Sequence, residues 1–211
     1  MEIEYKGGNG VFIKVGATMV AVDPNLSTIG LSNPKIENVI QLATEPRFCI
    51  ANGGEKLTIN GPGEYEVSGV AVKGIPAHRH LDGDNSFGST IYSVVAAGFR
   101  IAILGNISPK LTEDQLESIG VVDIAIVPVG GNGYTLDAHD AILVTRQIDP
   151  RVVIPVHYAD QDLNYEVPQD NIEGFLKELS ANQHETVEKL KLKPGSALPA
   201  GLTVFEVTRT K

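Results

Sequence analysis

The sequence contains a single cysteine, Cys49, among its 211 residues. One thiol cannot form an intrachain disulfide, which fits a protein kept in a reducing compartment. The chain also has no apolar run approaching the roughly 20 residues needed to span a bilayer. Its first residues show no basic segment followed by an apolar run, the pattern of a signal peptide. We therefore expect a cytoplasmic protein that has no membrane partner.

Positive charge is also scarce. The chain has 17 Lys and Arg residues against 26 Asp and Glu residues, which gives a formal net charge of -9. An acidic surface repels phosphate backbones on average, and no Lys/Arg-rich stripe interrupts it. We do not expect nucleic acid as a partner.

The composition is that of a chain that buries a core. Hydrophobic residues make up 42% and charged residues 20% of the sequence, which are ordinary values for a globular protein. The length fits one large domain or two small ones. Because no linker-like segment divides the chain, the sequence predicts a single domain over residues 1–211.

The first half of the chain consists of short apolar runs separated by Gly, Pro and Asn, a pattern typical of strands joined by turns. The sequence predicts strands at residues 11–15, 18–22, 38–42, 48–51, 57–59, 65–67, 70–72, 91–96 and 100–104.

Helical signals begin after this region. Thr112 followed by Gln115 forms a capping-box pattern that opens a short helix. Asp137 can cap a second helix, and Pro168 suits the first turn of a third. Between them, residues 123–127 and 151–156 form nearly unbroken apolar runs, which favour buried strands. Residues 202–207 are predicted as a last strand. Strand–helix alternation of this kind predicts sheets covered by helices.

Several motifs in this order resemble the metallo-β-lactamase-fold family, in particular its branch of small zinc-dependent hydrolases. They are NGPGEYEVSGV at residues 60–70, RIAILGNI at 100–107, VPVGG at 127–131 and VIPVHY at 153–158. The resemblance implies an α/β (α+β) fold of the αββα sandwich type, with two mixed β-sheets and helices on the outer faces. It also implies an active site at one edge of the sandwich, between loops that follow the strands.

The resemblance implies a metal site whose ligands are largely replaced here. The family carries an HxHxDH signature after a strand, and the corresponding segment is LATEPRFC at residues 42–49. Thr44, Pro46, Phe48 and Cys49 align with its ligands, and Pro and Phe cannot bind a metal. Asn106 stands at the position of the family's bridging Asp. His157 matches the last ligand. Arg79 aligns with the middle ligand, with His78 and His80 beside it.

The candidate metal ligands are therefore His157, His78, His80 and Asn106. Each has a simpler explanation: His157 as a hydrogen-bonded residue at a strand end, and His78 and His80 as members of an exposed polar loop over residues 78–85. Asp82 in the same loop is interpreted as a surface charge. Cys49 could join a three-ligand zinc site as a thiolate, although a free cysteine is more often a small buried apolar residue.

Two functions follow from the replaced ligands. In the first, the chain has lost the usual metal site and acts as a non-catalytic relative that needs no cofactor and binds an unknown small molecule or protein. In the alternative, it is a metal-dependent hydrolase of an ester, lactone or phosphoester that uses a reduced or rearranged zinc site. A structural subunit is a third hypothesis, and the sequence leaves self-association open.

Overall fold

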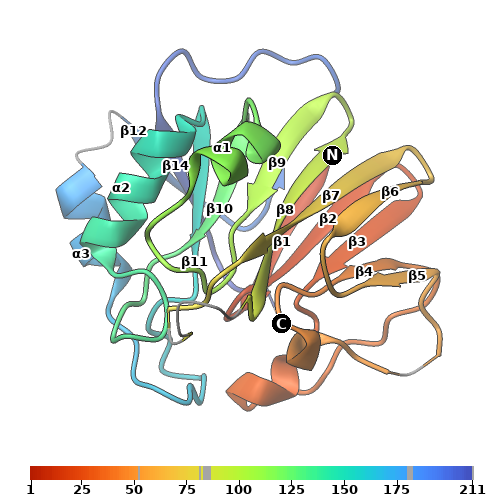
Figure 1. Ribbon diagram of the computed structural model, residues 1–211, viewed down its shortest axis with the longest axis horizontal. Helices are drawn as coiled ribbons and strands as arrows, with labels where there is room; N and C mark the ends of the chain where they lie inside the picture. Colours follow the sequence, from red (N-terminus) through yellow and green to blue (C-terminus); the bar gives the residue numbers. More distant parts are fainter. Residues whose placement is uncertain (52, 81, 83–86, 180–182, 211) are drawn as a thin grey trace.

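Two β-sheets pack face to face in the computed structural model, which describes residues 1–51, 53–80, 82, 87–179 and 183–210 (Figure 1). The smaller sheet has the strand order β13-β1-β2-β3-β4-β5. Its strands are β13 (Leu190–Lys191), β1 (Glu2–Gly7), β2 (Gly10–Val15), β3 (Thr18–Val22), β4 (Ile40–Leu42) and β5 (Leu57–Ile59). β1, β2 and β3 pair antiparallel, whereas β3, β4 and β5 pair parallel, so the sheet is mixed.

The larger sheet has the order β12-β14-β11-β10-β9-β8-β7-β6 and is also mixed. Its strands are β12 (Gln183–Val187), β14 (Thr203–Val207), β11 (Val152–Val156), β10 (Ile124–Pro128), β9 (Phe99–Ile103), β8 (Ser89–Ala96), β7 (Val70–Ala77) and β6 (Gly63–Val67). The part from β12 to β9 is parallel, and the part from β9 to β6 is an antiparallel meander.

Apolar side chains fill two layers. The first lies between the sheets, where Ile3 and Tyr5 of β1 alternate with polar residues that face outward. The second lies between the larger sheet and three helices, α1 (Glu113–Ile119), α2 (Ala138–Ile148) and α3 (Ile172–Leu179). The outer face of the smaller sheet is covered by a smaller cluster that includes Ile36 and Val39 of the β3–β4 connection. This arrangement confirms the predicted sandwich of two mixed sheets.

The predicted caps are confirmed. The Thr112 side chain accepts from the backbone of Gln115, and the Gln115 side chain accepts from the backbone of Thr112, which completes the capping box of α1. Asp137 accepts from the N–H of Asp140 at the start of α2. None of the helices in the described part of the chain has the length and apolar character needed to cross a bilayer.

The strand predicted at residues 48–51 is wrong. A 3-10 turn, η2 (Pro46–Phe48), occupies the first part of this segment. The side chain of Gln41 then donates to the carbonyl of Ile50 at 3.1 Å and accepts from its N–H at 2.7 Å. A buried glutamine thus binds the backbone groups that a neighbouring strand would have used.

The third helix begins later than predicted, at Ile172 rather than Pro168. The backbone N–H of Asp170 donates to the carbonyl of Gly130, and the carbonyl of Asp170 accepts from Ala159. Contacts with neighbouring loops therefore hold the segment before Ile172 in a non-helical form. The sequence analysis also missed β1, β12 and β13.

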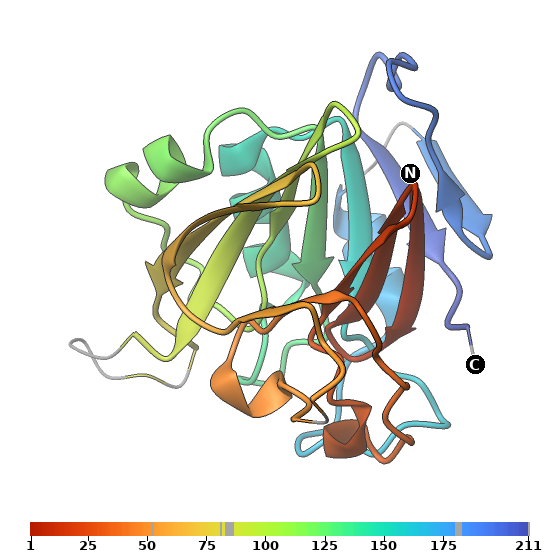
Figure 2. The same cartoon turned by 90° about the vertical axis from the view of Figure 1, so that its right-hand side faces the viewer.

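The loops that follow the strands meet at one edge of the sandwich. In Figure 2, this lower edge carries a red-orange turn, η1 (Leu26–Ile29), an orange turn, η2, and a cyan segment that follows β11. The resemblance described above implies an active site at such an edge, and polar residues from loops of both sheets meet here.

Candidate functional site

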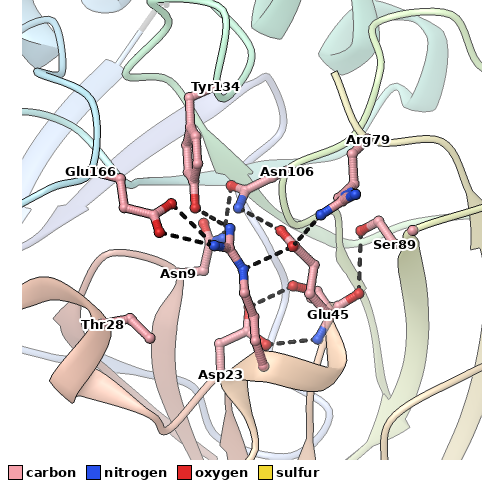
Figure 3. Close-up of polar contacts among 12 residues, drawn as sticks. Asn9, Asp23, Thr28, Glu45, Arg79, Ser89, Asn106, Tyr134 and Glu166 are labelled. Carbon is pink, nitrogen blue, oxygen red and sulfur yellow. Dashed lines mark hydrogen bonds and ion pairs between the residues drawn. The ribbon is translucent and has the colours of Figure 1, made fainter. Parts of the chain in front are cut away.

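The centre of the site is the buried carboxylate of Glu45, which follows β4 and is only 2% exposed. Its Oε2 accepts from Nε of Arg47 at 3.0 Å and from Nη1 of Arg79 at 3.3 Å. Its Oε1 accepts from Nδ2 of Asn106 at 2.9 Å. Figure 3 shows Arg79 and Asn106 converging on Glu45 from separate loops. Both oxygens of this carboxylate are therefore occupied by donors of the chain itself.

Arg47 extends from the centre toward solvent. Its Nη1 contacts both oxygens of Glu166, at 3.0 and 3.3 Å, and its Nη2 donates to the hydroxyl of Tyr134. Burial lowers the pKa of Arg47, but the adjacent carboxylate of Glu45 and that of Glu166 outweigh it and raise the pKa overall. The hydrogen bond from Arg47 lowers the pKa of Glu166. This guanidinium thus carries its charge at every physiological pH, held between two carboxylates.

Arg79 is fixed by a turn of its own loop. Asp82 accepts from Nε of Arg79 at 2.9 Å and from the backbone N–H groups of Arg79 and Gly88. Burial alone would raise the pKa of Asp82, but the hydrogen bonds from Arg79 lower it overall. The interpretation of Asp82 as a mere surface charge is wrong, because its carboxylate orients Arg79 toward Glu45.

The two asparagines beside Glu45 form an ordered chain. Nδ2 of Asn9 donates to Oδ1 of Asn106 at 2.9 Å, and both residues are buried. A carboxylate oxygen accepts hydrogen bonds, so the amide NH₂ of Asn106 must face Glu45 and its Oδ1 must face Asn9. The Oδ1 of Asn9 is left buried, with no partner among the described residues.

His157 follows β11 in a left-handed backbone conformation, with φ 53°. Its N–H donates to the carbonyl of Gly8 at 2.9 Å, which holds this uncommon geometry. Its ring lies against Tyr134 and Tyr165, with centroids 5.5 and 4.8 Å away. Burial lowers the pKa of His157 to about 4. The ring is therefore neutral near pH 7.

A small pocket lies beside these residues, lined by Gly8, Asn9, Asp23, Thr28, Tyr134, His157, Tyr165 and Glu166, among others. Its free space of about 20 Å³ accommodates one water-sized group. The pocket wall is a mixture of hydrogen-bonding atoms and aromatic rings.

Asp23 lies at the end of β3 and supports the site through hydrogen bonds with Thr44. Its Oδ1 accepts from the N–H of Thr44 at 2.7 Å, and its Oδ2 accepts from the hydroxyl of Thr44 at 2.6 Å. Burial raises the pKa of Asp23 to about 7, although the hydrogen bonds from Thr44 oppose the shift. These contacts fix the loop that carries Glu45.

The candidate ligands do not gather in one place. Asn106 and His157 lie at the site, whereas His78 stacks on Phe87 with ring centroids 4.3 Å apart. His80 lies near Asp140 of α2. Burial and the neighbouring Asp137 raise the pKa of Asp140, and His80 partly opposes this shift. Within the described residues, no group of three His, Cys, Asp or Glu side chains could hold a metal ion. Part of the predicted 78–85 loop, residues 81 and 83–85, lies outside the described residues.

The sequence analysis missed the residues that form the centre, namely Asn9, Glu45, Arg47, Tyr134 and Glu166. A signal for two of them was present, because Glu45 and Arg47 alternate with the aligned positions Thr44, Pro46 and Phe48. The side chains of Glu45 and Arg47, which lie between the aligned positions, enter the site. Burial raises the pKa of the Cys49 thiol, which disfavours the thiolate that a zinc ligand requires.

The donor set at the centre does not fit a divalent metal. Zinc requires several free imidazole, thiolate or carboxylate donors. Here the guanidiniums of Arg47 and Arg79 already occupy Glu45, and their positive charges repel a cation. The amide oxygen of Asn106 is likewise taken by Asn9.

Comparisons with known proteins show which family the chain resembles. The family model described as beta-lactamase superfamily domain matches residues 2–157. A metal-dependent hydrolase of the UPF0173 group from Natranaerobius thermophilus is 31% identical over 94% of this chain and 99% of its own length. Its counterpart from Thermus thermophilus is 23% identical over 94% of this chain and 98% of its own.

Solved structures agree on the fold. A metallo-beta-lactamase superfamily protein from Thermotoga maritima is similar at a TM-score of 0.73 and 25% identity, covering 98% of this chain and 100% of that protein. Igni18, a metallo hydrolase from Ignicoccus hospitalis, is similar at a TM-score of 0.65 and 18% identity, covering 85% and 90%.

Proposed function

The chain belongs to the metallo-β-lactamase superfamily, and from that premise we propose that it acts as a non-catalytic, metal-independent protein that binds a small polar ligand. One observation carries the proposal. The buried carboxylate of Glu45 accepts from Arg47 and Arg79, at 3.0 and 3.3 Å. Two fixed positive charges thus stand on the buried carboxylate at the centre of the site.

The electrostatics favour this state over metal binding. A cation placed near Glu45 would meet two guanidiniums, and either it or they would have to leave the carboxylate. Separating these charge pairs to admit the cation costs free energy, although less than for a fully buried pair, because both guanidiniums are partly exposed. The pocket beside the cluster, next to His157 and Tyr134, supplies the place for a ligand.

Metal content tests this proposal directly. We expect purified, untagged protein to contain substoichiometric zinc, manganese and iron by elemental analysis. The unfolding midpoint should also be the same in excess EDTA and in excess ZnCl₂, because no bound metal contributes to the free energy of unfolding. Stoichiometric zinc that survives dialysis against a weak chelator would show that the proposal is wrong.

A metal-dependent hydrolase of an ester, lactone or phosphoester is the second candidate. The printed names of the relatives favour it more directly than they favour the first, since those proteins are called metal-dependent hydrolases. In this chain a metal held by His157 would lie in a site that also contains the guanidiniums of Arg47 and Arg79.

An activity panel tests the second candidate. Ester, lactone and phosphoester substrates are assayed with added zinc, manganese or iron. Turnover that disappears in His157→Ala and persists in the surface variant His184→Ala would establish this candidate. Absence of turnover with every metal would exclude it for these three substrate classes.

A further inference from the structure

The pocket beside the Glu45 cluster presents a buried hydrogen-bond acceptor that no donor among the described residues satisfies. Asn9 lines this pocket and is 8% exposed. Because its Nδ2 must donate to Asn106, its Oδ1 is an acceptor, and this oxygen has no partner among the described residues. A buried acceptor without a donor is unfavourable, so a ligand that brings a donor relieves this cost.

His157 contributes a second acceptor to the pocket. Nε2 of Gln169 donates to the carbonyl of Val167 at 2.6 Å, which turns its Oε1 toward Nδ1 of His157 at 3.0 Å. Nδ1 of the neutral ring therefore carries the hydrogen and donates it to Gln169. Nε2 is then a lone-pair acceptor, on a ring that lines the pocket.

The charge around the pocket is negative. Among the described residues, the lining includes the carboxyl groups of Glu166 and Asp23 and the hydroxyl-bearing Thr28, but no Lys or Arg side chain. The lining itself therefore carries an excess of negative charge. Figure 3 shows Thr28, Asn9 and Glu166 on one side of the Glu45 cluster.

From these observations we infer that the pocket binds the primary ammonium group of a small amine, an assignment that rests on the proposed metal-independent function. An ammonium group has three N–H donors and no acceptor, which complements the acceptors of Asn9 and His157 and the carboxylate of Glu166. Its size matches the free space of about 20 Å³. An anion would face unsatisfied acceptors and the excess negative charge.

Methylammonium chloride is the probe. The unfolding midpoint and the heat of binding are measured against sodium chloride at equal ionic strength, with tetramethylammonium chloride as a second comparison. Tetramethylammonium carries the same charge but has no N–H donor and a larger head. We expect a saturable stabilisation by methylammonium and none by tetramethylammonium.

Two variants locate the binding. Glu166→Gln keeps an oxygen for Arg47 but removes the negative charge, so the affinity for methylammonium should fall about tenfold, the cost of a charged hydrogen bond. Glu117→Gln is the matched control, because Glu117 is an exposed residue of α1. Asn9→Ala removes the unpaired acceptor and should weaken the binding without changing the charge.

The outcomes separate this inference from the proposed function. If methylammonium and tetramethylammonium act alike, or if inorganic phosphate binds instead, the ammonium site is wrong. If methylammonium has no effect and zinc has none either, the ammonium site falls while the metal-independent function stands. Tight, stoichiometric zinc binding overturns the proposed function, whatever methylammonium does. Equal affinities in Glu166→Gln and Glu117→Gln would move any binding away from this pocket.

Discussion

Arg79 reaches Glu45 across the two sheets of the sandwich, with its Nη1 3.3 Å from Oε2 of the carboxylate. Arg79 follows β7 of the larger sheet, and Glu45 follows β4 of the smaller one. Asn106, after β9, joins the same carboxylate from the larger sheet. The buried charge cluster therefore links loops of both sheets at one edge of the sandwich. This geometry gives the cluster a structural role.

Glu45→Gln tests this structural role. The amide preserves the shape of the side chain but removes the charge, so Arg47 and Arg79 are left facing each other without their shared carboxylate. We expect the free energy of unfolding in urea to fall by about 2 kcal/mol, less than the loss for a fully buried pair because both guanidiniums are partly exposed. Glu117→Gln should change it by no more than about 0.5 kcal/mol. Equal stability of the two variants would contradict the role of the cluster.

Asp23 predicts a dependence of stability on pH. Burial raises its folded-state pKa to about 7 from a usual value of 3.8, so the folded protein binds the proton more tightly than the unfolded chain. The resulting stabilisation is fully present below about pH 4 and is lost as pH rises through 7. It amounts to something on the order of 4 kcal/mol.

Asp23→Asn isolates this contribution. The amide cannot ionise, and its oxygen can still accept from the N–H of Thr44. The free energy of unfolding of the wild type minus that of the variant should therefore be larger at pH 5 than at pH 8, measured in urea at both values. Taking this difference cancels the contributions that the other titrating groups make to the pH dependence of the free energy of unfolding. A difference that is constant with pH, or that grows toward pH 8, would show that Asp23 is ionised throughout this range.

The sequence predicted the fold better than the site. Caps such as Thr112 and Asp137 and the unbroken apolar runs are local signals, and the structure bears them out. The strand predicted at residues 48–51 failed because the buried side chain of Gln41 takes the backbone groups of Ile50. Such a contact between residues nine positions apart leaves no periodic pattern in the sequence.

The centre of the site depended on contacts of still longer range. Arg79 meets Glu45 from 34 positions away, and Arg47 meets Glu166 from 119 positions away. The resemblance indicated which loops meet, and it correctly brought Asn106 and His157 to the same edge. It could not indicate that the intervening positions, Glu45 and Arg47, point inward, because that depends on the conformation of the η2 turn.

Gly130 provides a test of how rigidly the His157 loop is held. A Cβ atom at this position would lie 2.2 Å from the carbonyl oxygen of His157 and 2.3 Å from Oε1 of Gln169. The first of these atoms belongs to the backbone and cannot turn away. Gly130→Ala should therefore lower the free energy of unfolding by about 3 kcal/mol, the upper range for overpacking. It should also displace the ring of His157 from Gln169.

Gly61→Ala is the matched control, since a Cβ there meets no atom within 4 Å. Because the same methyl group is added to the chain, the two variants differ only in the space around it. Gly61→Ala should change the free energy of unfolding by less than about 1 kcal/mol. The chemical shifts of the His157 ring, followed by NMR, should move in Gly130→Ala and stay in place in Gly61→Ala. If Gly130→Ala is as stable as the wild type with an unchanged His157 ring, the loop is less rigid than the close contacts at Gly130 indicate.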